Sequence, residues 1–365
     1  MSKFDVAAYI WPSYTGDELR TRIFWPEGYG EWETVKAAVA RFPGHQWPRK
    51  PVWGYVNEAD PCVMEMQINA AADHGVNVFI YDWYWYDGRP FLEQCLNNGF
   101  LKARNRDRMK FYLMWANHDV PYLWDRRIAY QHLPELIWRG RVTPDDFHII
   151  GRRWLENYFT LPEYYQIDGR PVVGIYDLWN LYLSFGGEEG VRREMTWLDE
   201  EAKKYGLPGV HFQVELTDEP HPEIGSCPER LIAMAKRLPF ASVTEYQFAA
   251  FTNMNREYSE ICEDAYRHWE DVKNTFSVPY YPNVSVGWDN TPRYPNHTDN
   301  VVRGNTPEEV EKAFRRAKEY AKQNGVRLIT VNSWNEWTET SYLQPDDLYG
   351  YGYLDAAKKV FLDEE

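Results

Sequence analysis

The chain has 365 residues and a formal net charge of −15. So acidic a chain lacks the basic surface that attracts nucleic acid or an anionic membrane, so a carbohydrate is the easier partner to accommodate. The length suits one large α/β barrel or two ordinary domains, and we expect the barrel.

Apolar strand-like runs alternate with helical patterns along the chain, which is typical of βα units around a parallel sheet. The eight runs cover residues 4–10, 76–81, 110–115, 171–176, 210–214, 242–246, 281–286 and 327–331. The clearest helical patterns cover residues 60–74, 145–158, 188–205, 228–238, 255–276 and 306–324. Repeated strand and helix predict a (β/α)8 TIM barrel, formed as a single domain by residues 1–365.

Two long segments, 11–58 and 118–143, are aromatic and basic insertions between the predicted elements. Loops that follow barrel strands gather at the C-terminal face, where barrel enzymes place their active sites. We therefore assign both insertions to loops that wall a cleft. The second would either close one end of the cleft, for exo action, or merely border it, for endo action.

Polar and aromatic side chains follow each predicted strand, and a barrel would bring them to one face. We predict that the following bind substrate: Trp11, Tyr14, Asp82, Trp83, Trp85, Trp115, Asn117, His118, Tyr176, Glu215, Tyr246, Trp288, Asp289, Asn335, Trp337 and Tyr342. Some of these residues could instead serve the fold. His118 could cap a loop, and Asp82 or Asp289 could bind backbone amides, which is about as frequent as substrate contact.

The chain is rich in aromatic residues, with 17 Trp, 27 Tyr and 17 Phe. A core of this size needs fewer, so we expect many rings to line a cleft, although an aromatic core accounts for some. The cluster YDWYWYDG at residues 81–88 favours the cleft. Its rings point to both faces of a strand and continue into a loop, where nothing needs burial.

The segment after the last predicted strand places Glu336 and Glu339 three residues apart. Glycosidic bonds are cleaved between two carboxyl groups, of which one protonates the leaving oxygen and the other acts as base or nucleophile. Residues three apart on a strand face opposite sides, so both carboxylates reach one cavity only if the chain turns after Asn335.

In most proteins such a pair is simply two solvated loop acids. The flanking residues favour a sugar site instead, because Trp334, Trp337 and Tyr342 supply flat faces for sugar C–H groups, and Asn332 and Asn335 supply amides for hydroxyls. Apolar rings beside Glu339 would also raise its pKa, as a general acid requires.

The four cysteines are scattered and form no C-x-x-C motif, so we expect reduced structural thiols and no metal site. The N-terminal residues MSKFDVAAYIWPSY lack a basic region followed by an apolar core. No stretch approaches the ~20 apolar residues of a membrane span. We expect residence in the cytoplasm, provided that no signal peptide has been removed.

Five motifs follow one another along the chain: AAYIWPSY, GVNVFIYDWYWYDGRPFLE, KFYLMWANHD, VSVGWDNTPR and NSWNEWTETSYLQPDDLYGYGYLDA. Together they resemble the WbsX-type proteins, which are relatives of glycoside hydrolase family 99, the endo-α-mannosidases. The resemblance implies a (β/α)8 barrel and a retaining glycosidase without metal or organic cofactor. It implies that Glu336 acts as base on the sugar's own 2-hydroxyl, giving an epoxide-like intermediate, and that Glu339 is general acid and then base.

Two positions depart from the family's pattern. Thr340 follows the acid pair where many relatives have glycine, so the loop and the subsite beyond it differ. His118 stands where a W-A-N-E pattern has glutamate, which bears on a contact to the sugar. Mannose, rhamnose or another sugar with an axial 2-hydroxyl would therefore suit the same mechanism.

Three functions remain open at this point. The first is a glycoside hydrolase acting on a poly- or oligosaccharide. The second is a glycosyltransferase or transglycosylase of surface-polysaccharide synthesis, although the chain has no G-x-G-x-x-G or D-x-D motif for a nucleotide sugar. The third is a non-catalytic glycan-binding protein, against which the acid pair argues.

Overall fold

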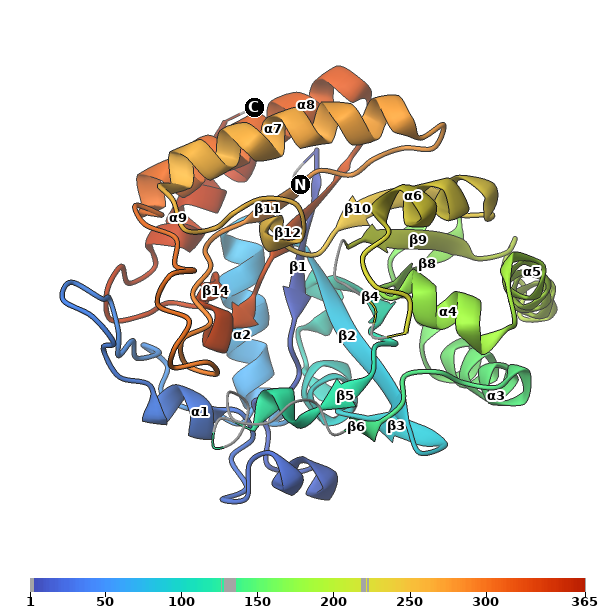
Figure 1. The fold of residues 1–365 in the computed structure, drawn as a ribbon, viewed down its shortest axis with the longest axis horizontal. Coiled ribbons are helices and arrows are strands. Elements are labelled where there is room, and N and C mark those ends of the chain that lie inside the picture. Colours follow the sequence, from blue (N-terminus) through green and yellow to red (C-terminus); the bar gives the residue numbers. More distant parts are fainter. Residues whose placement is uncertain (1–2, 126, 128–135, 218–220, 222, 365) are drawn as a thin grey trace.

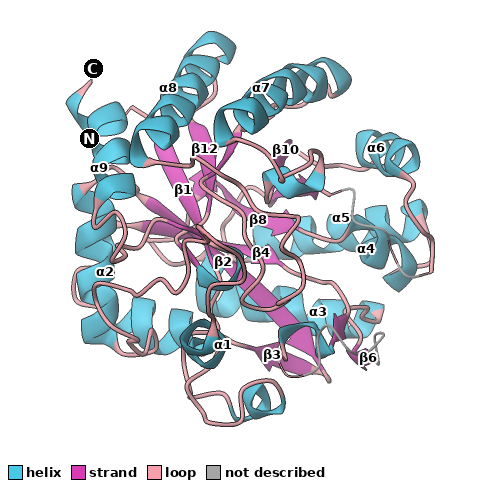
Figure 2. Ribbon diagram, turned by 60° about the vertical axis from the view of Figure 1, so that its left-hand side comes forward, coloured by secondary structure: helices cyan, strands magenta, loops and turns pink. Residues whose placement is uncertain are grey.

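The computed structural model describes residues 3–125, 127, 136–217, 221 and 223–364 (Figure 1). Its centre is a sheet of parallel strands with helices around it (Figure 2). The strand order is β10 (Ser242–Glu245), β9 (His211–Leu216), β8 (Arg170–Ile175), β4 (Lys110–Trp115), β2 (Val78–Tyr86), β1 (Asp5–Ile10), β12 (Leu328–Asn332) and β11 (Asn283–Ser285).

The first and last strands of this order meet through the residues just before β11. Val243 of β10 forms a parallel bridge with Tyr280. The backbone amide of Tyr281 donates to the carbonyl of Val243 at 2.9 Å, and the Thr244 hydroxyl donates to the carbonyl of Tyr281 at 2.9 Å. The sheet thus closes almost completely, and the predicted (β/α)8 barrel is confirmed.

The eight predicted strands are all present, and the largest difference in bounds is at β2. This strand continues to Tyr86 because it forms a hairpin with β3 (Arg89–Phe91). The two turn residues, Asp87 and Gly88, both have positive φ, at 55° and 68°. An Asp-Gly pair in this conformation is typical of a two-residue hairpin turn, so the end of the aromatic cluster is a hairpin and not an open loop.

Six predicted helices are present: α2 (Pro61–Asp73), α3 (Pro144–Trp154), α5 (Glu188–Lys204), α6 (Pro228–Arg237), α7 (Tyr258–Thr275) and α8 (Pro307–Asn324). The side chain of Asp60 caps α2, Thr143 and Asp146 form a capping box on α3, and Gly325 ends α8 at φ 66°. These are the sequence signals expected at helix ends.

Shorter elements complete the fold. Helices α1 (Trp32–Ala37), α4 (Leu178–Ser184) and α9 (Gly352–Lys358) accompany strands β5 (Val120–Pro121), β6 (Leu136–Trp138), β7 (Gln166–Ile167), β13 (Asn335–Glu336) and β14 (Ser341–Tyr342). Single turns of 3₁₀ helix lie at Leu19–Ile23, Phe100–Lys102, Arg106–Arg108, Tyr122–Trp124, Phe248–Ala250 and Trp337–Glu339. Short π-helical turns lie at Cys95–Gly99, Leu155–Phe159 and Lys359–Asp363.

The aromatic cluster at residues 81–88 mostly fills the core, contrary to the expectation that it lines a cleft. All nine residues of β2 are buried. The ring of Trp83 lies 5.2 Å from that of Trp154 in α3 and 6.0 Å from that of Trp85. Trp115 of β4 also packs against Trp154, at 5.8 Å. These rings face outward from the barrel, where the covering helices bury them.

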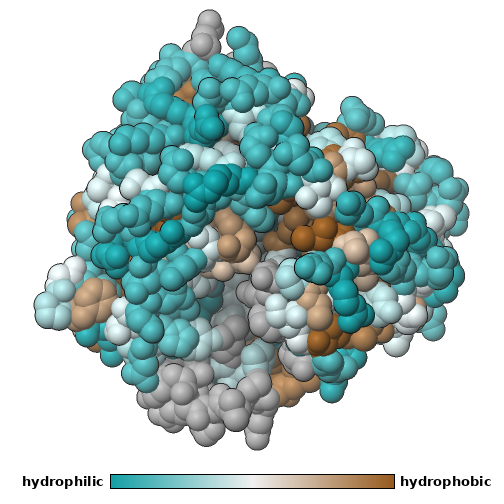
Figure 3. All heavy atoms as spheres, turned by 45° about the horizontal axis from the view of Figure 1, so that its top comes forward, coloured by the Kyte–Doolittle hydropathy of each residue, from teal (hydrophilic) through white to brown (hydrophobic). Residues whose placement is uncertain are grey.

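The face shown in Figure 3 is mostly hydrophilic, with hydrophobic residues gathered near its centre. Among the described residues, no helix is both long and apolar enough to cross a membrane.

Candidate functional site

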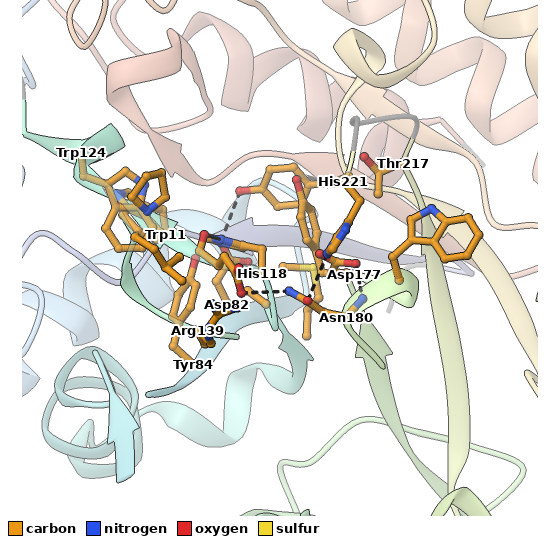
Figure 4. A pocket seen from close by; sticks show the side chains of 18 of the residues that line it. Trp11, Asp82, Tyr84, His118, Trp124, Arg139, Asp177, Asn180, Thr217 and His221 are labelled. Carbon is orange, nitrogen blue, oxygen red and sulfur yellow. Dashed lines mark hydrogen bonds between the residues drawn. The ribbon is translucent and has the colours of Figure 1, made fainter. Parts of the chain in front are cut away.

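A cavity of about 500 Å³ lies at the C-terminal ends of the barrel strands (Figure 4). Its size is within the ~300–1,000 Å³ typical of small-molecule sites. Figure 4 shows Trp11 and Trp124 at one end and Thr217 and His221 at the other. The predicted site residues that line it are Trp11, Asp82, His118, Tyr176, Tyr246, Glu336 and Glu339.

The second insertion walls this cavity, as predicted, whereas the first insertion lines it only through Trp11 at its start. Segment 11–58 contributes Trp11, and the described parts of segment 118–143 contribute His118, Asp119, Trp124 and Arg139, among others. Residues 126 and 128–135 of the second insertion lie outside the described residues.

The loop that carries the two glutamates turns after Asn335, as predicted. Asn335 and Glu336 form β13, which pairs with β14, and residues Trp337–Glu339 form a single 3₁₀ turn between them. Thr340 then adopts a left-handed conformation with φ 55°. Its hydroxyl accepts from Trp47 Nε1 at 3.0 Å and donates to the Asp289 carbonyl at 2.9 Å. These two bonds stabilise a conformation that is unusual for a β-branched residue.

Asn335 ties this loop to the barrel. Its Oδ1 accepts from the backbone amide of Trp11 at 2.8 Å, and its Nδ2 donates to Glu58 at 2.8 Å. Gln344, beyond the turn, also donates to Glu58 at 2.8 Å. Burial raises the pKa of Glu58 to about 7. Asn335 thus supports the loop from behind and does not line the cavity.

The two glutamates share one arginine. Arg293 Nη2 donates to Glu336 Oε1 at 2.8 Å, and Nη1 donates to Glu339 Oε1 at 3.0 Å. The same guanidinium donates from Nε to Glu31 Oε1 at 2.8 Å and from Nη2 to Glu31 Oε2 at 3.2 Å. A buried cation therefore holds three carboxylates together, which is the arrangement that offsets the cost of burying them.

Neither Arg293 nor Glu31 was among the residues predicted for the site. Arg293 ends the motif VSVGWDNTPR, and Glu31 lies within an insertion assigned to the cleft wall. Their distance along the chain, 262 residues, hides the pairing from any local pattern.

Glu336 is the deeper of the two acids, with 3% of its side chain exposed against 16% for Glu339. Burial raises the pKa of Glu336 well above its ordinary value, and the charge of Glu339 raises it further, whereas Arg293 lowers it. The hydroxyl of Tyr246 lies 3.4 Å from Glu336 Oε2 and 3.2 Å from Asp82 Oδ2, with one proton to donate. Burial and the neighbouring acids thus favour the protonated form of Glu336, and Arg293 favours its carboxylate form.

The rings of Trp337 and Tyr342 stack on each other at 3.8 Å instead of lining the cavity. Trp337 Nε1 donates to Gln344 at 2.7 Å, and the Tyr342 hydroxyl donates to Asp346 at 2.7 Å. The raised pKa that the structure gives at this site belongs to Glu336, and it arises from burial and from the neighbouring acids. An effect of the rings on the pKa of Glu339 stays a prediction.

His118 lies among aromatic rings of the cavity. Its ring centroid is 5.7 Å from that of Tyr84, 6.0 Å from Trp124 and 5.6 Å from Tyr176. The imidazole is thus part of the cavity wall, and substrate contact stays a prediction for it and for the other lining residues.

The remaining predicted site residues support the cavity without lining it. Tyr14 accepts the backbone N–H of Trp337 at 3.0 Å. Asn117 exchanges two hydrogen bonds with the backbone of Asp177, each 2.8 Å long. Asp289 lies 2.6 Å from His45 Nε2. Trp83, Trp85, Trp115 and Trp288 pack in or against the core.

Glu215, also predicted to contact substrate, lies inside the barrel and outside the cavity. It is fully buried and its Oε2 accepts from the Tyr9 hydroxyl at 2.7 Å. Burial raises the pKa of Glu215 from 4.5 to about 8. Glu215 is therefore protonated in the folded protein at neutral pH, where the same group in the unfolded chain is ionised.

The unfolding free energy of Glu215→Gln is expected to rise relative to that of the wild type as the pH rises. The raised pKa stabilises the wild-type fold below pH 4.5, and that stability is lost up to pH about 8. Because glutamine has no proton to lose, the difference in unfolding free energy should grow in favour of the variant by about 1.4 kcal/mol per pH unit over this interval. Denaturant unfolding of both proteins across this range measures it. A difference that does not depend on pH would contradict the raised pKa of Glu215 in the folded protein.

Among the described residues, no three His, Cys, Asp or Glu side chains are grouped so that they could hold a metal ion.

Comparisons with known proteins give three kinds of likeness. Residues 8–357 match the family model described as "Glycosyltransferase WbsX". The chain is 27% identical over 345 residues to the uncharacterized protein WxcX of Xanthomonas campestris pv. campestris, in strains B100 and ATCC 33913. The match covers 92% of this chain and 47% of the relative, so the chain spans about half the length of the curated relatives it matches.

Among solved structures, the chain resembles the endo-α-mannosidase of glycoside hydrolase family 99 from Bacteroides thetaiotaomicron in complex with bis-tris propane, with TM-score 0.61, 17% identity and coverage of 100% of this chain and 97% of that chain. A glycoside hydrolase-like protein aligns with TM-score 0.59 and 14% identity, over 99% of this chain and 94% of that one. The β-glucosidase from Thermotoga maritima in complex with glucoimidazole aligns with TM-score 0.51 and 11% identity, over 97% and 96%. At these sequence identities, the similarity shows a shared fold alone.

Proposed function

This chain belongs to the WbsX glycosyltransferase family, and from that premise we propose that it is an enzyme that breaks α-glycosidic bonds, as a retaining glycoside hydrolase. The observation that carries the proposal is the pair Glu336 and Glu339, held on one guanidinium in a cavity at the mouth of the barrel. A binding protein needs aromatic rings and amides, but it needs no second acid beside a buried glutamate whose pKa is raised, as that of Glu336 is.

The different depths of the two acids support different roles. Glu336, at the enclosed side, would face the sugar ring. In its carboxylate form, which Arg293 favours against burial and the charge of Glu339, it would remove the proton of the 2-hydroxyl while that oxygen attacks the anomeric carbon. Glu339, at the open side, would give its proton to the glycosidic oxygen as the bond to that oxygen breaks. The product of this step is an epoxide-like sugar.

The second step reverses the proton movements. Glu339, now a carboxylate, takes a proton from water as the water oxygen attacks the anomeric carbon, and Glu336 returns its proton to the 2-oxygen as the three-membered ring opens. Two displacements on the same carbon give net retention. The mechanism needs a 2-hydroxyl on the face opposite the leaving group, as in an α-mannoside or α-rhamnoside.

Transfer to another sugar is the second candidate, and the family's description as glycosyltransferase favours it. A sugar hydroxyl that replaces water in the second step would be deprotonated by Glu339 in the same way. The same two residues thus serve hydrolysis and transglycosylation, and neither needs a nucleotide sugar.

The test is incubation with a library of mannose- and rhamnose-rich oligosaccharides in heavy-oxygen water, followed by mass spectrometry. Hydrolysis is expected to place the label in a new reducing end and to identify the sugar. Rearranged glycans without label would establish transfer. Binding of a library glycan without any change in it would contradict the enzyme assignment and support a glycan-binding protein.

A further inference from the structure

Glu31 lies behind the acid pair and outside the lining of the cavity. It is fully buried and directly precedes α1. It accepts two hydrogen bonds from Arg293, at 2.8 and 3.2 Å, one from the Ser13 hydroxyl at 3.3 Å, and one from Trp11 Nε1. Its carboxylate therefore joins the loop after β1 to an arginine of the loop after β11.

The bonds from Glu31 orient the guanidinium of Arg293. A guanidinium is a rigid plane whose N–H groups point in set directions, so fixing one edge determines where the others point. The other N–H groups of Arg293 reach Glu336 at 2.8 Å and Glu339 at 3.0 Å. The ring of Trp11, whose indole N–H is held by Glu31, lies 5.7 Å from the guanidinium carbon.

We propose that Glu31 is a positioning residue for the acid pair, acting through Arg293 to hold Glu336 and Glu339 and through the indole of Trp11 to orient a wall of the cavity. This inference deepens the proposed function and rests on it for its catalytic meaning. The arrangement of the four charged groups, however, is testable without any substrate.

Glu31 also affects the pKa of Glu336 through its charge. The groups that face Glu336 are the acids Glu339, Glu31 and Asp82, the cation Arg293, and the hydroxyls of Tyr14, Tyr84 and Tyr246. Burial, Glu339, Glu31 and Asp82 raise the pKa of Glu336, and Arg293 lowers it. Removing the charge of Glu31 would remove one raising influence and leave the cation less compensated, so the pKa of Glu336 should fall.

A neighbouring acid provides a matched control. Glu33 is also buried and lies two residues along the same segment. Its Oε1 accepts the backbone N–H groups of Gly28 at 2.8 Å and Tyr29 at 3.4 Å. Its amide variant tests burial and local loop structure without touching the guanidinium.

The experiment is a pH titration of protein carrying ¹³C-labelled glutamate carboxyl groups, followed by NMR. The Glu336 signal is assigned by its loss in Glu336→Gln. In Glu31→Gln the midpoint of this signal is expected at lower pH than in the wild type, whereas in Glu33→Gln it stays at the wild-type value. An unchanged midpoint in folded Glu31→Gln would overturn the proposal.

A second variant covers the case in which Glu31→Gln does not fold. Glu31→Asp keeps the charge but withdraws it from the guanidinium, so the Glu336 midpoint should move in the same direction by a smaller amount. If Glu31→Asp folds with a wild-type midpoint, the proposal fails.

Activity distinguishes this inference from the proposed function. With a glycan identified in heavy-oxygen water, Glu31→Gln should lower kcat and shift the pH profile, and any change in KM reports the loss of the bond to Trp11. A shifted titration in a protein that processes no glycan would overturn the proposed function alone. Cleavage by the wild type together with an unmoved titration would overturn the role of Glu31 alone.

Discussion

Glu336→Gln is expected to abolish turnover of every glycoside while sugar binding persists. The amide keeps the shape of the side chain and a carbonyl oxygen for Arg293, which donates to Glu336 at 2.8 Å, but it has no lone pair basic enough to remove a proton from a 2-hydroxyl. Loss of a catalytic base lowers rates by about 10²–10⁴-fold. The measurement is kcat on the glycan identified in the library, with binding followed by calorimetry.

Glu163→Gln is a suitable control for the amide substitution. Glu163 is also buried, but it bonds Arg106 at 3.0 Å, and its own carbonyl accepts from Phe111 near the start of β4, at the opposite end of the barrel. Its variant should keep wild-type kcat even if it is less stable. Normal turnover by Glu336→Gln would remove this glutamate from the mechanism.

Glu339→Gln is expected to lose turnover of glycans by a similar factor but to retain its first step on a substrate that needs no acid. A glycan leaves as an alkoxide unless its oxygen is protonated, so the loss should be about 10²–10⁴-fold. Fluoride is a stable anion and leaves without a proton. The matching α-glycosyl fluoride should therefore still release fluoride with this variant, which an ion-selective electrode measures.

The fluoride substrate separates the two acids. Glu336→Gln lacks the base for the first step, so it should fail on the fluoride and on the glycan alike. If Glu339→Gln lost both activities and Glu336→Gln kept fluoride release, the roles would be exchanged. If both variants kept glycan turnover, the acid pair would have a structural function, which the bonds from Arg293 to both acids also accommodate.

The barrel was accessible from the sequence because each strand and helix carries its own local signal. Runs such as 110–115 and 327–331 are β-branched or apolar and bounded by turns, and β4 and β12 lie there. The helices begin at Asp60 and Thr143 and end at Gly325, which are residues that favour those positions. Right-handed βα units of this number have one compact closed arrangement.

The site was only partly accessible from the sequence. The pair Glu336 and Glu339 was found because the two acids stand three positions apart among aromatic residues, and the chain must turn for both to reach one cavity. Trp83 and Trp115 were assigned to the substrate because aromatic residues follow the strands, but their rings face the covering helices. The alternation of side chains along a strand shows that neighbouring residues point to opposite faces of the sheet. It does not show which face borders the cavity.

By itself the sequence determined the order of strands and helices, the barrel and the acid pair at the end of the last strand, because these depend on patterns within a few residues. The tertiary structure decided which acids are buried, which cation they share and which rings face the cavity. Arg293 meets Glu31 across 262 residues of chain and Glu336 across 43, and only closure of the barrel brings the three together. Their charges interact strongly because the same closure excludes water from between them.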